Sequence, residues 1–155
     1  MLRFRTCCID EEPAATLVRG MREEIAALYD GLRLDGAQMP KAGPAEMSPP
    51  GGCFVVGFDA DDVPVCCGGV KRLSADACEI KRMFVVEAAR GRGIARELLA
   101  ELERRARELG YSVVRLDTGP RQPRAQRMYE RAGYAAIENF NANPVASFFG
   151  EKPLN

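Results

Sequence analysis

The stretch MFVVEAARGRGIARELLAEL, residues 83–102, joins an apolar run to an amphipathic one through a turn that contains two glycines. The apolar run is typical of a strand, and apolar residues at helical spacing predict a helix over residues 94–109. Amides at a helix start lack partners within the helix, and glycine lets an anion approach the backbone closely. The turn therefore predicts an anion site, to which three side chains add positive charge: Arg90, Arg92 and Arg96.

The segments around this stretch predict a single mixed α/β domain over residues 2–155. Helical spacing indicates a first helix from about Leu17 to Leu28 and a last one over residues 123–132. The short apolar start of the chain predicts a strand before the first helix. Apolar runs bounded by turn residues predict strands at residues 53–58, 63–73, 78–86, 111–118 and 147–152. Tight turns make the first three of these strands antiparallel. The order of elements indicates an α+β sheet with helices on its faces.

Glycine marks two further places in the chain. Gly68 and Gly69 interrupt a predicted strand, which indicates a bulge or a close backbone approach. Residues 34–52 are rich in Gly and Pro and predict a long loop. Long loops in compact domains are often functional, so this one is a candidate substrate loop, with a plain or disordered linker as the alternative.

Composition excludes several classes of function. The chain carries 22 basic and 22 acidic side chains, so its zero net charge argues against nucleic acid as a general partner. No apolar run reaches the roughly 20 residues of a membrane span. The N-terminal residues also lack the pattern of a secretory signal. We therefore expect a cytoplasmic protein with no membrane partner.

The sequence has six cysteines and no histidine. The cysteines form no C-x-x-C pair and most lie in apolar runs, which favours reduced, buried thiols over a metal site or a reactive thiol. Without histidine, the chain has neither a Ser-His-Asp triad nor a histidine-ligated metal, and we expect no metal. Acid–base chemistry must then use carboxylates, tyrosine, lysine, cysteine or water.

Three alternatives compete with an anion site at the turn. An ordinary glycine turn into a helix needs no ligand at all. A dinucleotide-binding fingerprint would require glycine where Arg96 stands, and its incoming strand would lack the charges of Glu79 and Lys81. Finally, LDTG at residues 116–119 matches the active-site triplet of retroviral-type aspartic proteases, but the predicted helices are too extensive for that all-β fold.

Two sequence blocks together resemble the GNAT superfamily of N-acetyltransferases. The first, [QR]-x-x-G-x-[GA], is matched by Arg90, Gly93 and Ala95. The second, N-x-x-A-x-x-L-Y-x-x-x-G-[FY], is matched at five positions: Ala125, Met128, Tyr129, Gly133 and Tyr134. The resemblance implies a mostly antiparallel mixed sheet whose fourth and fifth strands splay apart, with helices on both faces. It also implies acetyl transfer from acetyl-CoA to a primary amine by direct attack in a ternary complex.

The resemblance assigns the donor site residue by residue. The turn would bind the coenzyme A pyrophosphate through its backbone, at Arg90, Gly91, Arg92, Gly93, Ile94, Ala95 and Arg96. The preceding strand would pair with the pantetheine arm and turn an amide toward the thioester oxygen, through Met83, Phe84 and Val85. Gln122 stands where the family usually has Asn, so its amide would reach the pantetheine with one extra methylene.

Two residues are the catalytic candidates. Tyr129 matches the tyrosine that protonates the departing thiolate in many relatives, with an ordinary core tyrosine as the alternative. Glu79 stands where some relatives place a general base, with a solvated, arginine-paired glutamate as the alternative. Burial would raise its pKa and fit it for that role.

The acceptor is not identified by either block. We expect the first helix, residues 34–52 and residues 138–144 to shape its site, with four candidate contacts: Glu46, Asn139, Phe140 and Asn141. A homodimer is common among such relatives. The non-enzymatic alternative is an acyl-CoA-binding sensor, which would keep the donor site without catalysis.

Overall fold

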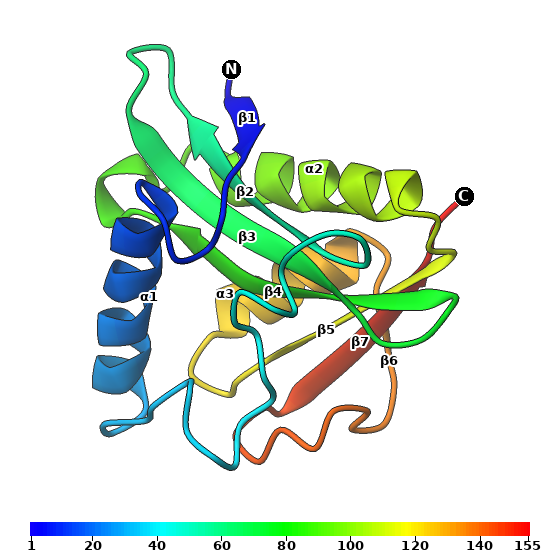
Figure 1. Ribbon diagram of the computed structural model, residues 1–155. Coiled ribbons are helices and arrows are strands. Elements are labelled where there is room, and N and C mark those ends of the chain that lie inside the picture. Colours follow the sequence, from blue (N-terminus) through cyan, green and yellow to red (C-terminus); the bar gives the residue numbers. More distant parts are fainter.

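The computed structural model describes all of residues 1–155, as a seven-stranded mixed sheet flanked by three α-helices (Figure 1). The strand order is β1-β2-β3-β4-β5-β7-β6, and only β4 and β5 pair in parallel. Along the chain the elements are β1 (Arg3–Thr6), α1 (Ala14–Leu28), β2 (Cys53–Phe58), β3 (Pro64–Arg72), β4 (Ala77–Val85), the 3-10 turn η1 (Glu87–Ala89), α2 (Ile94–Glu108), β5 (Val113–Thr118), α3 (Pro123–Arg131), β6 (Ala135–Ala136) and β7 (Phe148–Pro153).

The predicted class and order of elements are confirmed. The sequence missed only η1 and β6, which have three and two residues and so leave no periodic pattern. The predicted strand over residues 53–58 matches β2 at both ends, because all six of its side chains are buried. Such a strand must be covered on both faces, and β2 lies between β1 and β3 in the sheet.

Strands β4 and β5 separate soon after they begin. They pair through three residues of each strand, ending at Glu79 opposite Arg115. Beyond that point β5 pairs only with β7, up to Thr118, while β4 stays on β3 up to Val85. The expected splay of the fourth and fifth strands is therefore confirmed, and it leaves one edge of β4 without a strand partner.

A bulge in β4 lies at this separation. Between the pairs Gly69–Lys81 and Cys67–Phe84, two residues of β4 stand opposite Gly68 alone. One of the two, Arg82, has a φ of 61°, in the left-handed region. The bulge predicted at Gly68-Gly69 is thus present. A Cβ on Gly68 would lie 2.8 Å from Leu102 Cδ1, so the glycine also lets α2 approach the sheet closely.

The helices cover opposite faces of the sheet (Figure 1). Helices α2 and α3 pack on one face, in a core cluster that includes Leu98, Leu102 and Tyr129. Helix α1 packs on the other face, in a second cluster that includes Leu17 and Met21.

Residues 34–52 form neither helix nor strand, as expected of a loop. The loop is packed against the domain, because Ala42 and Met47 are buried in the core cluster of α1. It is also tied to the sheet, since Lys71 Nζ donates to the carbonyl oxygen of Lys41 at 2.5 Å. The loop therefore belongs to the folded domain and does not behave as a disordered linker.

All six cysteines carry free thiols. Four of them, Cys53, Cys66, Cys67 and Cys78, are buried in the sheet, which confirms the expectation drawn from their apolar surroundings. No helix of the molecule is both long enough and apolar enough to cross a membrane.

Candidate functional site

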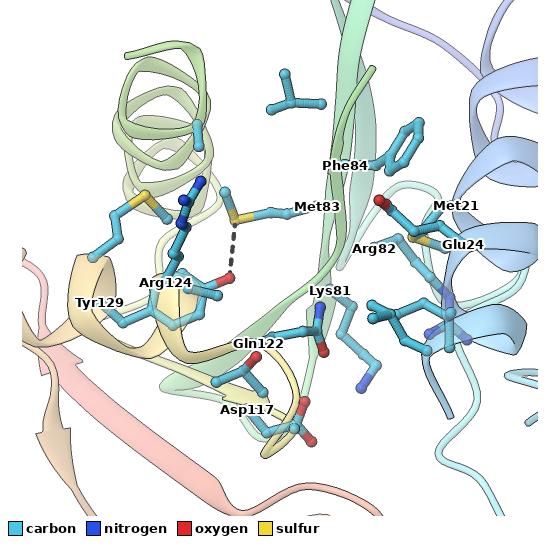
Figure 2. A pocket seen from close by; sticks show the side chains of 18 of the residues that line it. Met21, Glu24, Lys81, Arg82, Met83, Phe84, Asp117, Gln122, Arg124 and Tyr129 are labelled. Carbon is cyan, nitrogen blue, oxygen red and sulfur yellow. Dashed lines mark hydrogen bonds between the residues drawn. The ribbon is translucent and has the colours of Figure 1, made fainter. Parts of the chain in front are cut away.

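A cavity of about 920 Å³ lies where β4 and β5 separate. Its walls come from α1, the loop after α1, the second half of β4, the turn before α2, the segment after β5, and α3. Figure 2 shows how β4 divides it: Met83 points toward α3, whereas Arg82 and Phe84 lie on the side of α1. Two chemically different compartments therefore meet at one strand.

The turn before α2 contributes a row of free amides to this cavity. The amide groups of residues 91–96 have no hydrogen-bond acceptor within the chain. Gly91 and Gly93 have φ values of 80° and 77°, and a Cβ built on either would meet no atom within 4 Å. Because α2 begins at Ile94, its dipole adds positive potential at the same place. This arrangement can hold a phosphate group.

The arginines of the turn play different parts. Arg90 already has partners within the protein: its guanidinium pairs with Glu24 of α1 at 2.8 Å and also donates to the carbonyl oxygen of Val85. Arg92 is exposed and lies off the cavity wall. Arg96 lines the cavity together with Arg124, and both also line a second, adjoining pocket with Arg131. None of these last three arginines has a carboxylate within ion-pairing distance.

Met83, Phe84 and Val85 all line the cavity, on the stretch of β4 that β5 leaves unpaired. Tyr129 of α3 lies beside them, and its hydroxyl donates to Met83 Sδ at 3.7 Å (Figure 2). Burial raises the pKa of Tyr129, and the negative charge of Asp117 raises it further. The phenol is therefore protonated and stays available as a donor at neutral pH.

Gln122 directly precedes α3 and lines the cavity. Its Oε1 accepts a hydrogen bond from the hydroxyl of Tyr29 at 3.0 Å, which leaves the amide NH₂ free. The same hydroxyl accepts from the Arg121 amide at 3.2 Å. A Cβ on Gly119 would collide with Tyr29, so this glycine is what lets the end of α1 dock beside the segment after β5.

Glu79 is fully buried just behind the cavity wall. Its Oε2 accepts from Lys81 Nζ at 3.1 Å and from Asn141 Nδ2 at 2.9 Å, while Oε1 has no partner. Burial raises the pKa of Glu79, the Lys81 ammonium opposes that shift, and Asp117 adds to it. This is the direction that a general base requires, although the side chain reaches the cavity only through its neighbours.

Asp117 is the carboxylate that does line the cavity. Its Oδ2 accepts from Asn141 Nδ2 at 2.7 Å and from Asn143 Nδ2 at 3.0 Å. Because one amide group bridges the buried Glu79 and the half-buried Asp117, the two carboxylates form a single network. The sequence shows Asp117 only within the LDTG stretch and gives no sign of its connection to Glu79.

The four candidate acceptor contacts do not line this cavity. Asn141 instead bridges the two carboxylates, and Asn139 Oδ1 accepts from the amide of Ala142 at 2.8 Å. Phe140 packs edge-to-face on a neighbouring phenylalanine, and Glu46 accepts from a loop amide. Their role as acceptor contacts remains a prediction, and the structure shows each of them in a supporting position.

Other cavity residues were missed by the sequence reasoning. They include Tyr29, Leu34, Met39, Lys81 and Arg82. The only signal for Lys81 and Arg82 in the sequence is that they stand, with Glu79, as charges in a predicted strand whose other residues are apolar. The expected contribution of the 34–52 loop agrees with the position of Leu34 and Met39 on the wall.

Comparison with known proteins adds three findings. An IAA acetyltransferase of Azospirillum brasilense is 40% identical over 79 residues, which are 49% of this chain and 51% of that protein. A Klebsiella pneumoniae structure, provisionally assigned as an acyl-CoA N-acyltransferase, superposes with a TM-score of 0.80 at 25% identity, over 100% of this chain and 99% of the other. An Elizabethkingia anophelis GNAT acetyltransferase with acetyl-CoA bound gives 0.67 at 13% identity, over 99% and 98%.

These matches differ in reach. The structural ones extend over the whole fold, whereas the chain spans about half the length of the curated relatives it matches. A family model described as the acetyltransferase (GNAT) family matches residues 20–134, which contain both sequence blocks, the splayed strands and the free amides of the turn. The chain therefore belongs to the GNAT family of acetyltransferases.

Proposed function

We propose that the protein is an N-acetyltransferase that moves the acetyl group of acetyl-CoA to a primary amine by direct attack in a ternary complex. One observation carries the proposal: free amides, an unpaired strand edge, a protonated tyrosine and a carboxylate all face the same cavity. Bound acetyl-CoA would supply the acyl group on a good leaving group, and the residues of the chain would bind it, stabilise the developing charge and transfer the protons.

The donor site fits coenzyme A at both of its charged parts. The amides of residues 91–96 would hold the pyrophosphate, which has room because the two glycines place no Cβ in the way. The unpaired Arg96, Arg124 and Arg131 would face the remaining phosphate at the outer end. The acetyl-CoA that the Elizabethkingia relative binds supports this assignment.

The unpaired edge of β4 would bind the pantetheine arm. Backbone groups that lose their strand partner at the splay must find another one, and an extended amide-containing chain can provide it in the manner of an added strand. An amide of Met83, Phe84 or Val85 would also stabilise negative charge on the carbonyl oxygen during attack. The NH₂ group of Gln122 is free to donate to the same arm.

The network of Glu79 and Asp117 would accept the proton of the attacking amine. An ammonium near pKa ~10 must lose a proton before its nitrogen can attack. Asp117 lies on the wall and Glu79 lies behind it with one free oxygen, so a water molecule between the amine and this network would complete the path. The raised pKa of Glu79 brings this carboxylate closer to the amine in basicity.

Tyr129 would protonate the departing thiolate. Its hydroxyl already donates to a sulfur atom, Met83 Sδ, so it can turn to a second sulfur in the same cavity. Burial raises the pKa of the phenol, and the same desolvation raises that of a bound thiol from its usual ~8.5. The proton transfer therefore stays nearly balanced inside the cavity.

The Tyr129→Phe variant separates an enzyme from an acyl-CoA sensor. We expect thiol release from acetyl-CoA, measured with a panel of amines, to fall by about 10²-fold or more, because general-acid catalysis contributes at least that much. Thermal stabilisation by acetyl-CoA should stay close to that of the wild type. Stabilisation without thiol release for any amine would favour the sensor, and an unchanged rate in the variant would remove Tyr129 from the mechanism.

A further inference from the structure

The compartment on the α1 side of β4 carries one charge that the protein does not balance. Arg82 lines the cavity, and its guanidinium makes neither an ion pair nor a hydrogen bond; only its carbonyl oxygen has a partner, Cys67 Sγ at 3.7 Å. Figure 2 shows the side chain extending from β4 toward α1, beside Met21. By contrast, Lys81 is paired with Glu79 and Arg121 with Asp30.

The other walls of this compartment are mainly apolar. Its walls include Leu28, Leu32, Leu34, Met39 and Phe84. Burial lowers the pKa of Arg82 and the nearby positive charge of Arg22 lowers it further, while the more distant carboxylates of Glu79, Asp117 and Asp35 oppose the shift without pairing with the guanidinium. The guanidinium of this half-buried residue has lost part of its hydration without gaining a hydrogen-bonded partner, and that loss is costly unless something else compensates it.

We propose that Arg82 binds a carboxylate on the acceptor, so that the acceptor is a small amine with a carboxylate and an apolar side chain, of the kind that apolar amino acids provide. This inference rests on the proposed function, because it assigns the second substrate of the same reaction. A guanidinium can bind a carboxylate through two parallel hydrogen bonds, which fixes the orientation of the bound molecule.

The position of Arg82 suits that task. Residue 82 lies in the bulge of β4, three residues after Glu79, and its neighbour Met83 faces the donor side. A carboxylate held by Arg82 would thus place a nearby amine between the carboxylate network and the thioester. The ammonium first gives one proton to the network, and the free amine nitrogen then bonds to the acetyl carbon as the carbon–sulfur bond breaks. Tyr129 gives its proton to the thiolate, and the second proton that the nitrogen loses restores the phenol.

The positive charge of Arg82 also argues against strongly cationic acceptors. The cavity has only two acidic residues on its wall, Glu24 and Asp117. Glu24 is paired with Arg90, and Asp117 is engaged by two asparagines. A polyamine or a multiply charged aminoglycoside would bring further cations against an unbalanced guanidinium, which is unfavourable at short range in an apolar cavity.

Matched acceptors test the proposal. Thiol release from acetyl-CoA would be measured for leucine, methionine and phenylalanine, for their amides, and for the amines that lack the carboxyl group. We expect kcat/KM for the acids to exceed that for the amides by about 10- to 100-fold, the range that a charged hydrogen bond contributes. Arg82→Gln should raise KM for the acids and remove the preference, whereas Arg82→Lys should restore part of it.

The controls keep the two proposals separate. Arg19→Gln removes an exposed positive charge from α1 that does not line the cavity, and it should leave the preference unchanged. Thermal stabilisation by acetyl-CoA shows that each variant is folded and binds the donor. If stabilisation persists but acids are used no better than amides, or none of the acids is acetylated, the inference about Arg82 is wrong. Loss of stabilisation in the wild type would instead contradict the donor site itself.

Discussion

Glu79 shows how a single residue can combine a structural and a chemical role. It is the last residue of β4 that pairs with β5, and it is completely buried. One carboxylate oxygen is held by Lys81 and Asn141, whereas the other has no partner. A merely structural glutamate would use both oxygens, so the free one indicates a place for a water molecule or a proton.

A pH profile tests this role. Glu79 must be ionised to accept a proton, and burial raises its pKa, so kcat should fall as the pH drops through that raised value. Because Asp117 is coupled to it through Asn141, the acidic limb belongs to the pair. We expect Glu79→Gln to lower kcat by about 10²-fold or more and to remove or displace this limb.

Glu103→Gln is the matched control for that variant. Glu103 is also buried, and it accepts hydrogen bonds from Tyr134 at 2.8 Å and Lys152 at 3.0 Å; it lines the adjoining pocket and not the main cavity. Its replacement should cost stability and keep the acidic limb of the profile. If Glu79→Gln retains wild-type kcat and the same limb, Glu79 is a structural residue and the proton goes elsewhere.

At the residue scale, the sequence could indicate types of side chain but not their connections. It pointed to Glu79 and Tyr129 through the sequence blocks. It could not connect Glu79 with Asn141, which is 62 residues away, because the contact depends on how the last loop folds back. It also could not predict the left-handed φ of Arg82, since an arginine rarely adopts that conformation.

At the scale of elements, the turn from β4 to α2 needs left-handed backbone conformations and is also the proposed phosphate site. Gly93 directly precedes α2 in a left-handed conformation, and no side chain caps the helix there. Gly110, after the other end of α2, has a φ of 96° and equally open surroundings, but it lies off the cavity. Replacing either glycine should therefore cost a similar amount of stability, but only Gly93 lies at the proposed phosphate site.

Alanine at these two positions separates fold from function. Each substitution should lower the free energy of unfolding by about 1–2 kcal/mol, the cost of a left-handed residue with a Cβ. In a domain of this size that is a fall in Tm of about 2–8 °C. Only Gly93→Ala should also weaken acetyl-CoA binding, because its Cβ would project into the phosphate site. Equal affinity in the two variants would contradict the assignment of the turn.

The helices and strands were predictable wherever the sequence has a regular spacing of apolar residues or a residue that ends an element, such as glycine. Helix α2 was expected over residues 94–109 and is observed as Ile94–Glu108, because its apolar spacing and Gly110 leave little ambiguity. The loop over residues 34–52 has no period, so its buried Met47 could not be foreseen. For the same reason the sequence could not show that the four candidate acceptor contacts lie off the cavity wall, since irregular segments are positioned by tertiary packing alone.

At the scale of the whole molecule, two core clusters hold the sheet between its helices. Each cluster contains buried cysteines, whose reactivity can show whether that cluster is intact. Cys66 belongs to the cluster of α2 and α3, and Cys67 to that of α1. Burial raises the pKa of Cys66 and of Cys78 to about 12. These thiols are therefore both inaccessible and protonated at neutral pH, and alkylation of them requires the core to open.

Alkylation with iodoacetamide should accordingly label the native protein at two positions at most. Those are Cys7, which is half-buried, and Cys8, which is exposed. In denaturant all six should react, and mass spectrometry would count them. Rapid labelling of four or more thiols under native conditions would mean that one face of the sheet is not covered as described.

The most direct test of the central claim is a calorimetric titration of the wild-type protein with acetyl-CoA, with Gly93→Ala and Gly110→Ala alongside. If the cavity at the splay of β4 and β5 is the donor site, the wild type should bind saturably at one site per chain and gain thermal stability, by about 2.7 kcal/mol at a hundredfold excess over Kd. Gly110→Ala should bind as the wild type does, and Gly93→Ala more weakly. No heat of binding and no thermal shift at millimolar acetyl-CoA would contradict the proposed function.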